Sequence, residues 1–271
     1  MNLYGPKFSF VVVVLFMAGS ASVWATSSFA ANGFPSERNL TRFFESVVFG
    51  AEYGDVTRES AIVKKWKSPL RISVSAMNGK LAQKAGGGRE LKLKNVRAKP
   101  AHVASIQAHL RVLIKLTGIV SEDAKKVGKS PNYFIKFVPA LAMHLPSLIK
   151  GASPQLLKRL AAPRVCYFVT AANRRGEIVQ ATIVVNNQMT DQQINSCLLE
   201  EMTQTLGLPN DSDIVKPSVF NNKSVLNKLT RNDLIVVGTL YDERLTPGME
   251  RKKAVTKAAS IIGDVLKRLQ Q

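Results

Sequence analysis

The chain has 271 residues and a formal net charge of +19 at pH 7, from 38 lysines and arginines against 19 acidic residues. A chain of this length forms one sizeable core or two small ones. After the first thirty residues no apolar run is long enough to span a bilayer, which excludes a protein with several membrane spans. A surface this basic attracts polyanions and anionic membrane surfaces.

Residues 1–30 have the features of an export signal. Lys7 precedes the apolar run Phe8–Ala18, and Ser28-Phe29-Ala30 places small residues at the positions that signal peptidase reads. Val23-Trp24-Ala25 is a second possible cleavage site. The alternative is a membrane anchor, but the run is short for a membrane span. We therefore predict a cleaved signal peptide.

Cleavage leaves residues 31–271 as a soluble protein that is periplasmic or secreted. Its expected partners are a peptide, an envelope polyanion or an anionic membrane surface, since nucleic acid is not the usual polyanion outside the cytoplasm. The mature part contains two cysteines, Cys166 and Cys197. An even count in an exported chain favours a disulfide between them over two buried thiols.

The first part of the mature chain predicts helices and one strand. Ser36 is placed to cap a helix that runs to about Tyr53, and a short helix is predicted over Ala61–Lys65. Leu70–Ala76 alternates apolar and polar residues and predicts a strand. Asn78–Pro100 is basic and rich in glycine, which indicates a mobile excursion or a hairpin, with an ordinary solvated loop as the alternative.

The middle of the chain combines a helix, a strand and an irregular segment. A helix begins at Pro100 and ends at Gly118, and Tyr133–Val138 is predicted to be a strand. The apolar stripe of this helix is expected to comprise Val103, Ile106, Leu110, Leu113, Ile114 and Thr117. Leu141–Leu160 is broken by prolines and glycine, and is predicted to be a loop with short helices.

Two further strands precede the most informative helix. Val165–Ala171 and Ile178–Asn187 are predicted to be strands joined by a turn at Asn173–Gly176. Thr190 and Gln193 form a capping box, so a helix is expected from Asp191 to Leu206, with Gly207 supplying a left-handed residue after it.

The last third of the chain is predicted to be helical. Thr230 caps a helix that ends near Tyr241, and Thr246-Pro247 starts a last helix that ends near Leu269. No internal repeat or strong linker separates the elements. The order of elements predicts a single α+β domain over residues 31–271, with helices on a mixed sheet and a helical C-terminal part.

The helix at 191–206 has the outline of a zinc-protease motif, H-E-x-x-H-x-x-G-x-x-H, without its histidines. Glu200, Gln204 and Asn210 occupy the three ligand positions, and Glu201 occupies the position of the general base. One carboxylate and two amide oxygens are a poor set of zinc ligands, so no metal or other cofactor is expected. His102, His109 and His144 lie elsewhere in the chain and do not replace the missing ligands.

Several segments resemble the uncharacterised bacterial family called domain of unknown function 2927. They are Phe49–Gly54, Lys65-Trp66, Cys197–Asp211, and Leu240-Tyr241 through Pro247-Gly248-Met249. The resemblance extends over nearly all of the mature chain and implies an exported protein. It brings no established activity.

A more distant resemblance is to the metzincin proteases, whose motif H-E-x-G-H-x-L-G-L-x-H is similar to Glu200–Asn210. Ser218–Phe220 resembles the methionine turn of matrixin-type metzincins, and Leu229–Asp233 with Leu240-Tyr241 resembles their C-terminal helix. The resemblance implies a zincin-like scaffold in which the strand Ile178–Asn187 holds an extended substrate. The three histidines and the methionine are replaced by other residues. The resemblance therefore implies the scaffold of these proteases and not their zinc site.

Three hypotheses follow. In the first, a non-catalytic, metzincin-like exported protein binds a peptide, an envelope polymer or a partner protein through a candidate cleft at Glu200, Gln204, Asn210 and Asp211, or through its basic surface. In the second, it is an atypical hydrolase in which Glu200 and Glu201 act as acid and base, Glu201 being the candidate catalytic residue. In the third, the cluster only caps, pairs and packs. We expect a non-enzyme.

Overall fold

The computed structural model describes residues 35–50, 61–83, 86–161, 166–221 and 225–269. The predicted signal peptide lies outside these ranges, so the structure does not test it. Within the described residues, no helix combines the length and the apolar character needed to cross a membrane.

The described residues form six strands and six α-helices, and the last three elements of the chain are helices. The strands are β1 Lys65–Trp66, β2 Ile72–Gln83, β3 Arg89–Val96, β4 Tyr133–Val138, β5 Cys166–Ala172 and β6 Glu177–Asn186. The α-helices are α1 Glu37–Phe49, α2 Pro100–Thr117, α3 Pro154–Leu160, α4 Asp191–Gln204, α5 Arg231–Tyr241 and α6 Arg251–Leu269. This composition confirms the predicted α+β class and the helical C-terminal part.

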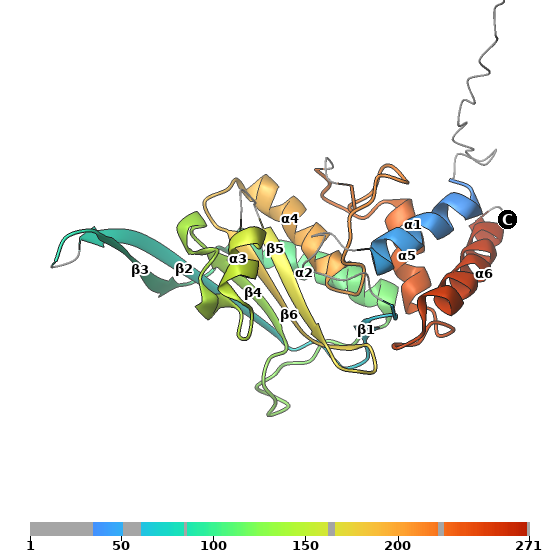
Figure 1. Ribbon diagram of the computed structural model, residues 1–271, viewed down its shortest axis with the longest axis horizontal. Coiled ribbons are helices and arrows are strands. Elements are labelled where there is room, and N and C mark those ends of the chain that lie inside the picture. The colour runs from blue at the N-terminus through green and yellow to red at the C-terminus, as the bar shows by residue number, and fades with distance from the viewer. Residues whose placement is uncertain (1–34, 51–60, 84–85, 162–165, 222–224, 270–271) are drawn as a thin grey trace, which may run out of the picture.

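The strands form one mixed six-stranded sheet (Figure 1). Its order is β1-β6-β4-β2-β3, and β5 pairs with β6 in the antiparallel direction. The neighbours β2, β4 and β6 run parallel, whereas β2 and β3 form an antiparallel hairpin. Parallel neighbours need crossover connections, which α2 and the segment after β4 supply.

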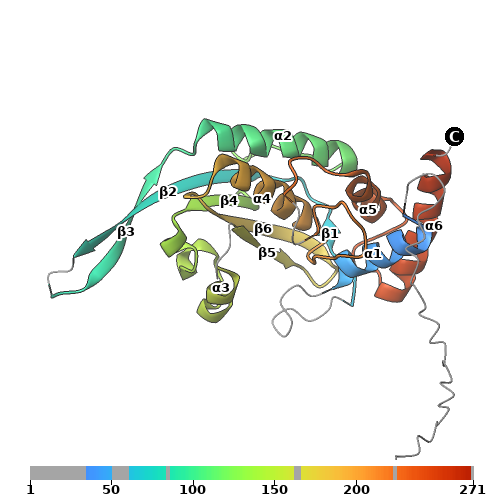
Figure 2. The same ribbon diagram turned by 90° about the horizontal axis from the view of Figure 1, so that it is seen from above.

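Side-chain alternation along the strands gives the molecule its layers. In β4, Ile135 and Phe137 face the main core, whereas Val138 faces a second core on the other side of the sheet. Helices α2 and α4 lie against the first face, and α3 lies on the side of the second (Figure 2). The prediction of short helices over Leu141–Leu160 is confirmed by α3 and two 3₁₀ turns.

Helices α1, α5 and α6 pack together at one end of the molecule (Figure 1). The apolar stripe of α1 is buried, as the helical spacing predicts; it comprises Leu40, Phe43, Phe44, Val47 and Val48. The ring of Phe43 meets the edge of Phe220 at 5.9 Å between centroids. This contact joins α1 to the loop that follows α4.

The predicted helix caps are confirmed. The hydroxyls of Ser36, Thr190 and Thr230 accept backbone N–H groups of α1, α4 and α5, and both threonines form capping boxes. Gly118 ends α2 in the left-handed conformation, with φ of 70°. These signals are local, so they are readable without the rest of the fold.

Several boundaries and one buried face differ from the predictions; among them, β2 runs from Ile72 to Gln83 and α4 ends at Gln204. The prediction of a helix over Ala61–Lys65 is wrong, because Lys65–Trp66 forms the strand β1, which pairs with β6. The last helix begins at Arg251 and not near Thr246, and α1 ends at Phe49, before a C-cap at Gly50. The buried residues of α2 are His102, Ile106, His109 and Leu113, a stripe that is rotated from the predicted one towards α4.

The predicted disulfide between Cys166 and Cys197 is confirmed. It joins β5 to α4 across 31 residues of sequence. In the chain-entropy model a loop of this length contributes on the order of 3 kcal/mol to the free energy of unfolding. The bridge therefore fixes the antiparallel edge of the sheet to the helix that carries the protease-like motif.

The basic segment Asn78–Pro100 is a hairpin, which decides between the predicted alternatives. Strands β2 and β3 continue beyond the sheet and project away from the body, at the end opposite α6 (Figure 1). Lys80 lies directly opposite Lys92, so these side chains share one face of the hairpin. Leu91 and Leu93 are on the other face, where they pack against the second core.

Candidate functional site

Two of the three candidate ligands of the protease-like helix, Gln204 and Asn210, are held by hydrogen bonds within the protein. Gln204 is 2% exposed, and its Nε2 donates a hydrogen bond of 2.8 Å to Oδ1 of Asp211. Gln204, in the second ligand position, is therefore hydrogen-bonded to Asp211, the residue that follows the third ligand position. This partly buried amide–carboxylate pair fixes the loop after α4.

Asn210, in the third ligand position, forms hydrogen bonds with α1. Its Nδ2 donates to the carbonyl oxygen of Ser46 at 3.1 Å and to that of Asp211 at 2.8 Å. Its backbone N–H donates to the carbonyl oxygen of Val47 at 3.2 Å. The close approach leaves no room for a side chain at Gly50, where a Cβ would lie 2.3 Å from Asn210 Nδ2.

The two glutamates differ in burial. Glu201 is 7% exposed, whereas Glu200 is half-buried. Burial raises the pKa of the neighbouring Tyr133, and the negative charge of Glu201 raises it further. The Tyr133 hydroxyl forms a hydrogen bond of 2.7 Å with Oγ1 of Thr205. Glu201 therefore lies beside a buried phenol that stays protonated at physiological pH.

Among the residues that the structure describes, no three His, Cys, Asp or Glu side chains come together as a metal site. The histidines are placed elsewhere. Nε2 of His102 lies 3.1 Å from Oδ1 of Asp191, and Nε2 of His109 lies 3.1 Å from Oδ1 of Asn195, so both join α2 to α4. His144 is exposed in the segment after β4.

The buried His109 gives the protein a pH dependence. Burial lowers the pKa of His109 below its ordinary value, although hydrogen bonds to Asn195 oppose the change. As the pH falls through about 6.5, the unfolded chain binds a proton at this position before the folded protein does. The free energy of unfolding should therefore fall below about pH 6.5, and His109→Gln should reduce the slope. Urea unfolding at about pH 7 and about pH 5 measures both.

The matched control is His144→Gln, which changes an exposed histidine. It should leave the pH dependence of unfolding as in the wild type. An unaltered slope in His109→Gln would contradict the assignment.

The end of α4 is enclosed by aromatic side chains from distant segments. The Tyr241 hydroxyl donates to the carbonyl oxygen of Leu206 at 2.8 Å, and Nε1 of Trp66 donates to that of Thr205 at 3.0 Å. The backbone N–H of Trp66 donates in turn to the Tyr241 hydroxyl at 3.2 Å. Lys65-Trp66 and Leu240-Tyr241 therefore support the end of the motif helix.

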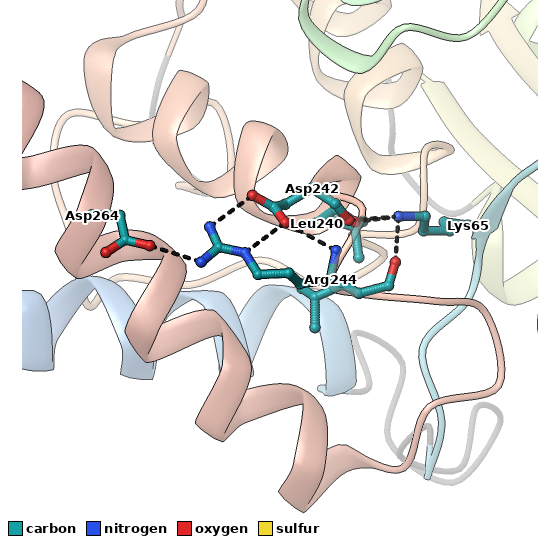
Figure 3. Close-up of polar contacts among 6 residues, drawn as sticks. Lys65, Leu240, Asp242, Arg244 and Asp264 are labelled. Atoms are coloured by element: carbon teal, nitrogen blue, oxygen red, sulfur yellow. Dashed lines mark hydrogen bonds and ion pairs between the residues drawn. The ribbon is translucent and has the colours of Figure 1, made fainter.

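The side chain of Lys65 caps the C-terminal end of α5 (Figure 3). It is 5% exposed, and its Nζ donates to the carbonyl oxygens of Leu240, Asp242 and Leu245 at 2.8, 3.3 and 2.6 Å. Burial, with a smaller effect from Lys67, lowers the pKa of Lys65 to about 8. Three carbonyl acceptors at the end of α5 make Lys65 a structural cap.

The segment that resembles the methionine turn is tied to α5 by a buried carboxylate. Oδ1 of Asp233 accepts a hydrogen bond of 2.6 Å from the Ser218 hydroxyl and one of 3.2 Å from the backbone N–H of Val219. Its Oδ2 accepts from the backbone N–H of Thr230 at 2.7 Å. Asp233 therefore joins the 218–220 turn to the start of α5.

The strand Ile178–Asn187 is not open to a substrate, which corrects that expectation. Residues 181–185 pair with β4 on one side and with β5 on the other, and Glu177 and Ile178 pair with β1. Both edges of the strand are therefore used inside the sheet. An extended peptide would have no free hydrogen-bonding edge there.

A basic groove lies at the root of the hairpin, near the N-terminal end of α4, where His102 and Lys99 contact Asp191. It has a volume of about 450 Å³ and is lined by the cationic side chains of Lys80, Arg97 and Lys99, together with His102. Three side-chain amides also line it, from Asn78, Asn187 and Gln188. Cations with amide donors and acceptors suit an anionic, hydroxyl-rich ligand.

Sequence reasoning identified the charge of this segment and missed the groove. The lysines of β3 alternate with Leu91 and Leu93, and that alternation predicts a strand with one basic face. The other walls come from β4 and from residues that follow β6, so only the assembled sheet forms the concave surface.

The family model for a protein of unknown function, DUF2927, matches residues 37–258. The chain belongs to this family. The match begins at the first residue of α1 and ends within α6, so it includes the hairpin, the motif helix and the Lys65 cap. No curated protein and no solved structure matches the chain. The DUF2927 assignment confirms the family resemblance and brings no activity with it.

Proposed function

We propose that this DUF2927 protein is an exported, non-catalytic binding protein that holds an anionic envelope polymer in the groove at the root of the β2–β3 hairpin. The observation that carries the proposal is the grouping of Lys80, Arg97 and Lys99 around one concave surface. The volume of about 450 Å³ is within the range of ligand sites in proteins.

The hairpin extends the positive charge of the groove. Lys80, Lys92 and Lys94 share one face, because Lys80 pairs with Lys92 and Asn78 pairs with Lys94. Two ion pairs reduce the charge only in part: Lys92 lies 3.4 Å from Glu90, and Lys99 lies 3.7 Å from Asp191. Both lysine side chains are at least 60% exposed, so these pairs contribute little and are open to competition by a ligand.

The motif helix supports the non-catalytic part of the proposal. Gln204 and Asn210 are engaged in hydrogen bonds that fix the loop and α1. We infer that the scaffold is metzincin-like, since α4, the left-handed turn at Gly207, the 218–220 turn and α5 follow one another as that resemblance requires. The atypical hydrolase with Glu200 and Glu201 stays a prediction from sequence.

Export to the periplasm or outside the cell is part of the same proposal. The disulfide supports it, because such bonds persist in oxidising compartments. An exported protein with a net positive charge meets anionic envelope polymers, which is why we propose such a polymer as the ligand. An anionic membrane surface is the alternative ligand.

The proposal predicts a local loss of binding when the charge of the hairpin is reversed. Replacing Lys80, Lys92 and Lys94 by glutamate should weaken binding to heparin, a model polyanion, by about tenfold or more at low salt. Surface plasmon resonance over a series of salt concentrations measures the affinity and its salt dependence. The wild type should bind more weakly as salt rises, because screening reduces exposed charge interactions.

The matched control reverses three exposed lysines on α6, Lys252, Lys253 and Lys267, and so gives the same net charge. It should retain most of the wild-type affinity. An equal loss in both variants would show that only net charge matters and would overturn the site. Vesicles of phosphatidylglycerol and phosphatidylcholine test the competing ligand, and tighter binding to the anionic vesicles than to the polymer would favour a membrane surface.

A further inference from the structure

The cations of the basic groove at the root of the hairpin are of two kinds. Lys80, from β2, and Arg97, from the segment between β3 and α2, line the groove, and neither has an ion-pair partner in the described part of the chain. Lys99 also lines the groove, but its Nζ lies 3.7 Å from Oδ1 of Asp191. One part of the groove is therefore open to an anion, whereas another part already holds one.

His102 completes the surroundings of the Asp191 carboxylate. Its Nε2 lies 3.1 Å from the same oxygen, Oδ1, and because an ionised carboxylate only accepts hydrogen bonds, this nitrogen donates. The His102 ring is 3% exposed and stacks on Phe137 with 4.8 Å between centroids, so its donor is held in place. The hydrogen bond from His102 and the charge of Lys99 lower the pKa of Asp191, which therefore stays ionised at physiological pH. Lys99 and His102 thus form a subsite for one anionic oxygen.

The side chain of Asp191 is free to leave this subsite without disturbing α4. The side chains of Asp191 and Lys99 are 62% and 60% exposed, so water solvates the carboxylate when it turns outwards. Exposed ion pairs of this kind contribute little to stability. Although Asp191 is the first residue of α4, Thr190 and Gln193 form the cap of this helix, and the cap does not use the Asp191 side chain. An external anion can therefore replace the carboxylate while the start of the helix remains capped.

We propose that Asp191 occupies an anion subsite of the groove, formed by Lys99 and His102, and that an anionic group of the bound polymer displaces it. This inference rests on the function proposed above. A polymer bound at Lys80 and Arg97 holds its next anionic groups near Lys99 at a high effective concentration, an advantage that a free small anion lacks. Asp191 thus acts as an internal competitor, which lowers the affinity of the groove for anions that are not already bound at the open cations.

Asp191→Asn tests the competition, because it removes the charge and keeps the size of the side chain. In the full mature protein this variant should bind heparin about threefold more tightly than the wild type at the same low salt, a factor in the range of an exposed ion pair. Surface plasmon resonance measures the affinity. A residue that only joins α4 to α2 would give the opposite sign, since its loss loosens the wall of the groove. Unchanged or weaker binding therefore overturns the proposal.

Asp213→Asn is the matched control. The Asp213 side chain is 64% exposed, and its Oδ1 lies 3.5 Å from Nζ of Lys216, so charge, exposure and pairing with a lysine match those of Asp191. Neither Asp213 nor Lys216 lines the groove. The control should bind heparin as the wild type does. An equal gain in both variants would show that net charge is the cause and would overturn the subsite.

A double-mutant cycle with Lys99 tests the location of the competition. In Lys99→Gln the cation that Asp191 neutralises is absent, so the further change Asp191→Asn should tighten heparin binding clearly less than it does in the wild type. An equal gain with and without Lys99 overturns the assignment. The two proposals also fail separately. A wild type that does not bind heparin overturns both, whereas binding that the hairpin substitutions weaken and Asp191→Asn does not tighten overturns this inference alone.

Discussion

Replacing Gly207 by alanine is expected to lower the free energy of unfolding by about 3 kcal/mol or more, or to prevent folding. Gly207 has φ of 113°, a conformation that residues with a Cβ rarely adopt. A Cβ there would lie 2.0 Å from the carbonyl oxygen of Lys64, so the backbone just before β1 would have to move. Urea or thermal unfolding, followed by circular dichroism, measures the change.

Gly118→Ala separates the contribution of conformation from that of the clash. Gly118 also has positive φ, at 70°, but a Cβ there would meet no atom within 4 Å. The control should therefore lose only about 1–2 kcal/mol, the cost of the left-handed conformation. If the two variants lost equal stability, the close approach of Gly207 to Lys64 would not matter.

Lys65→Met is expected to lower the free energy of unfolding by about 3 kcal/mol. Methionine has a similar length and is apolar, but it removes the donor from the carbonyl oxygens of Leu240, Asp242 and Leu245. Buried acceptors that lose their partner retain the full cost of desolvation. Equilibrium unfolding in urea gives the value.

Lys65 has two exposed lysine neighbours that serve as controls, Lys64 and Lys67. The same substitution to methionine at either position should change stability by less than about 0.5 kcal/mol. Charge and composition change identically in all three variants. A similar loss at Lys64 or Lys67 would mean that the cap on α5 is not the cause.

Local signals predicted much of the fold. Thr190 and Thr230 indicate where their helices begin, because each capping hydroxyl accepts from a backbone N–H only three residues further along the chain. Lys65-Trp66 was missed because a two-residue strand has no pattern of its own, and it forms through pairing with Glu177 and Ile178. The rotated stripe on α2 was missed because two histidines, polar by composition, are buried through bonds to α4.

For the candidate site, residue types alone support one inference, which stays a prediction. The absence of histidines from the motif predicts an absence of zinc chemistry, and residue types alone carry that inference. Where the remaining side chains point depends on contacts across the fold. Asn210 bonds to Ser46, which is 164 positions away, and no spacing rule connects them.

The pairing of Lys80 with Lys92 links the order of the hairpin to its ligand. Like charges directly opposite on neighbouring strands repel, so the hairpin carries a local cost when no anion is bound. A bound anion between the two ammonium groups would replace repulsion with attraction and favour the paired state by mass action. Amide protons of β2 and β3 beyond the sheet would then exchange more slowly as polymer is added, while those of β4 would not change. Slower amide exchange in the hairpin would then indicate that a ligand occupies the groove at its root.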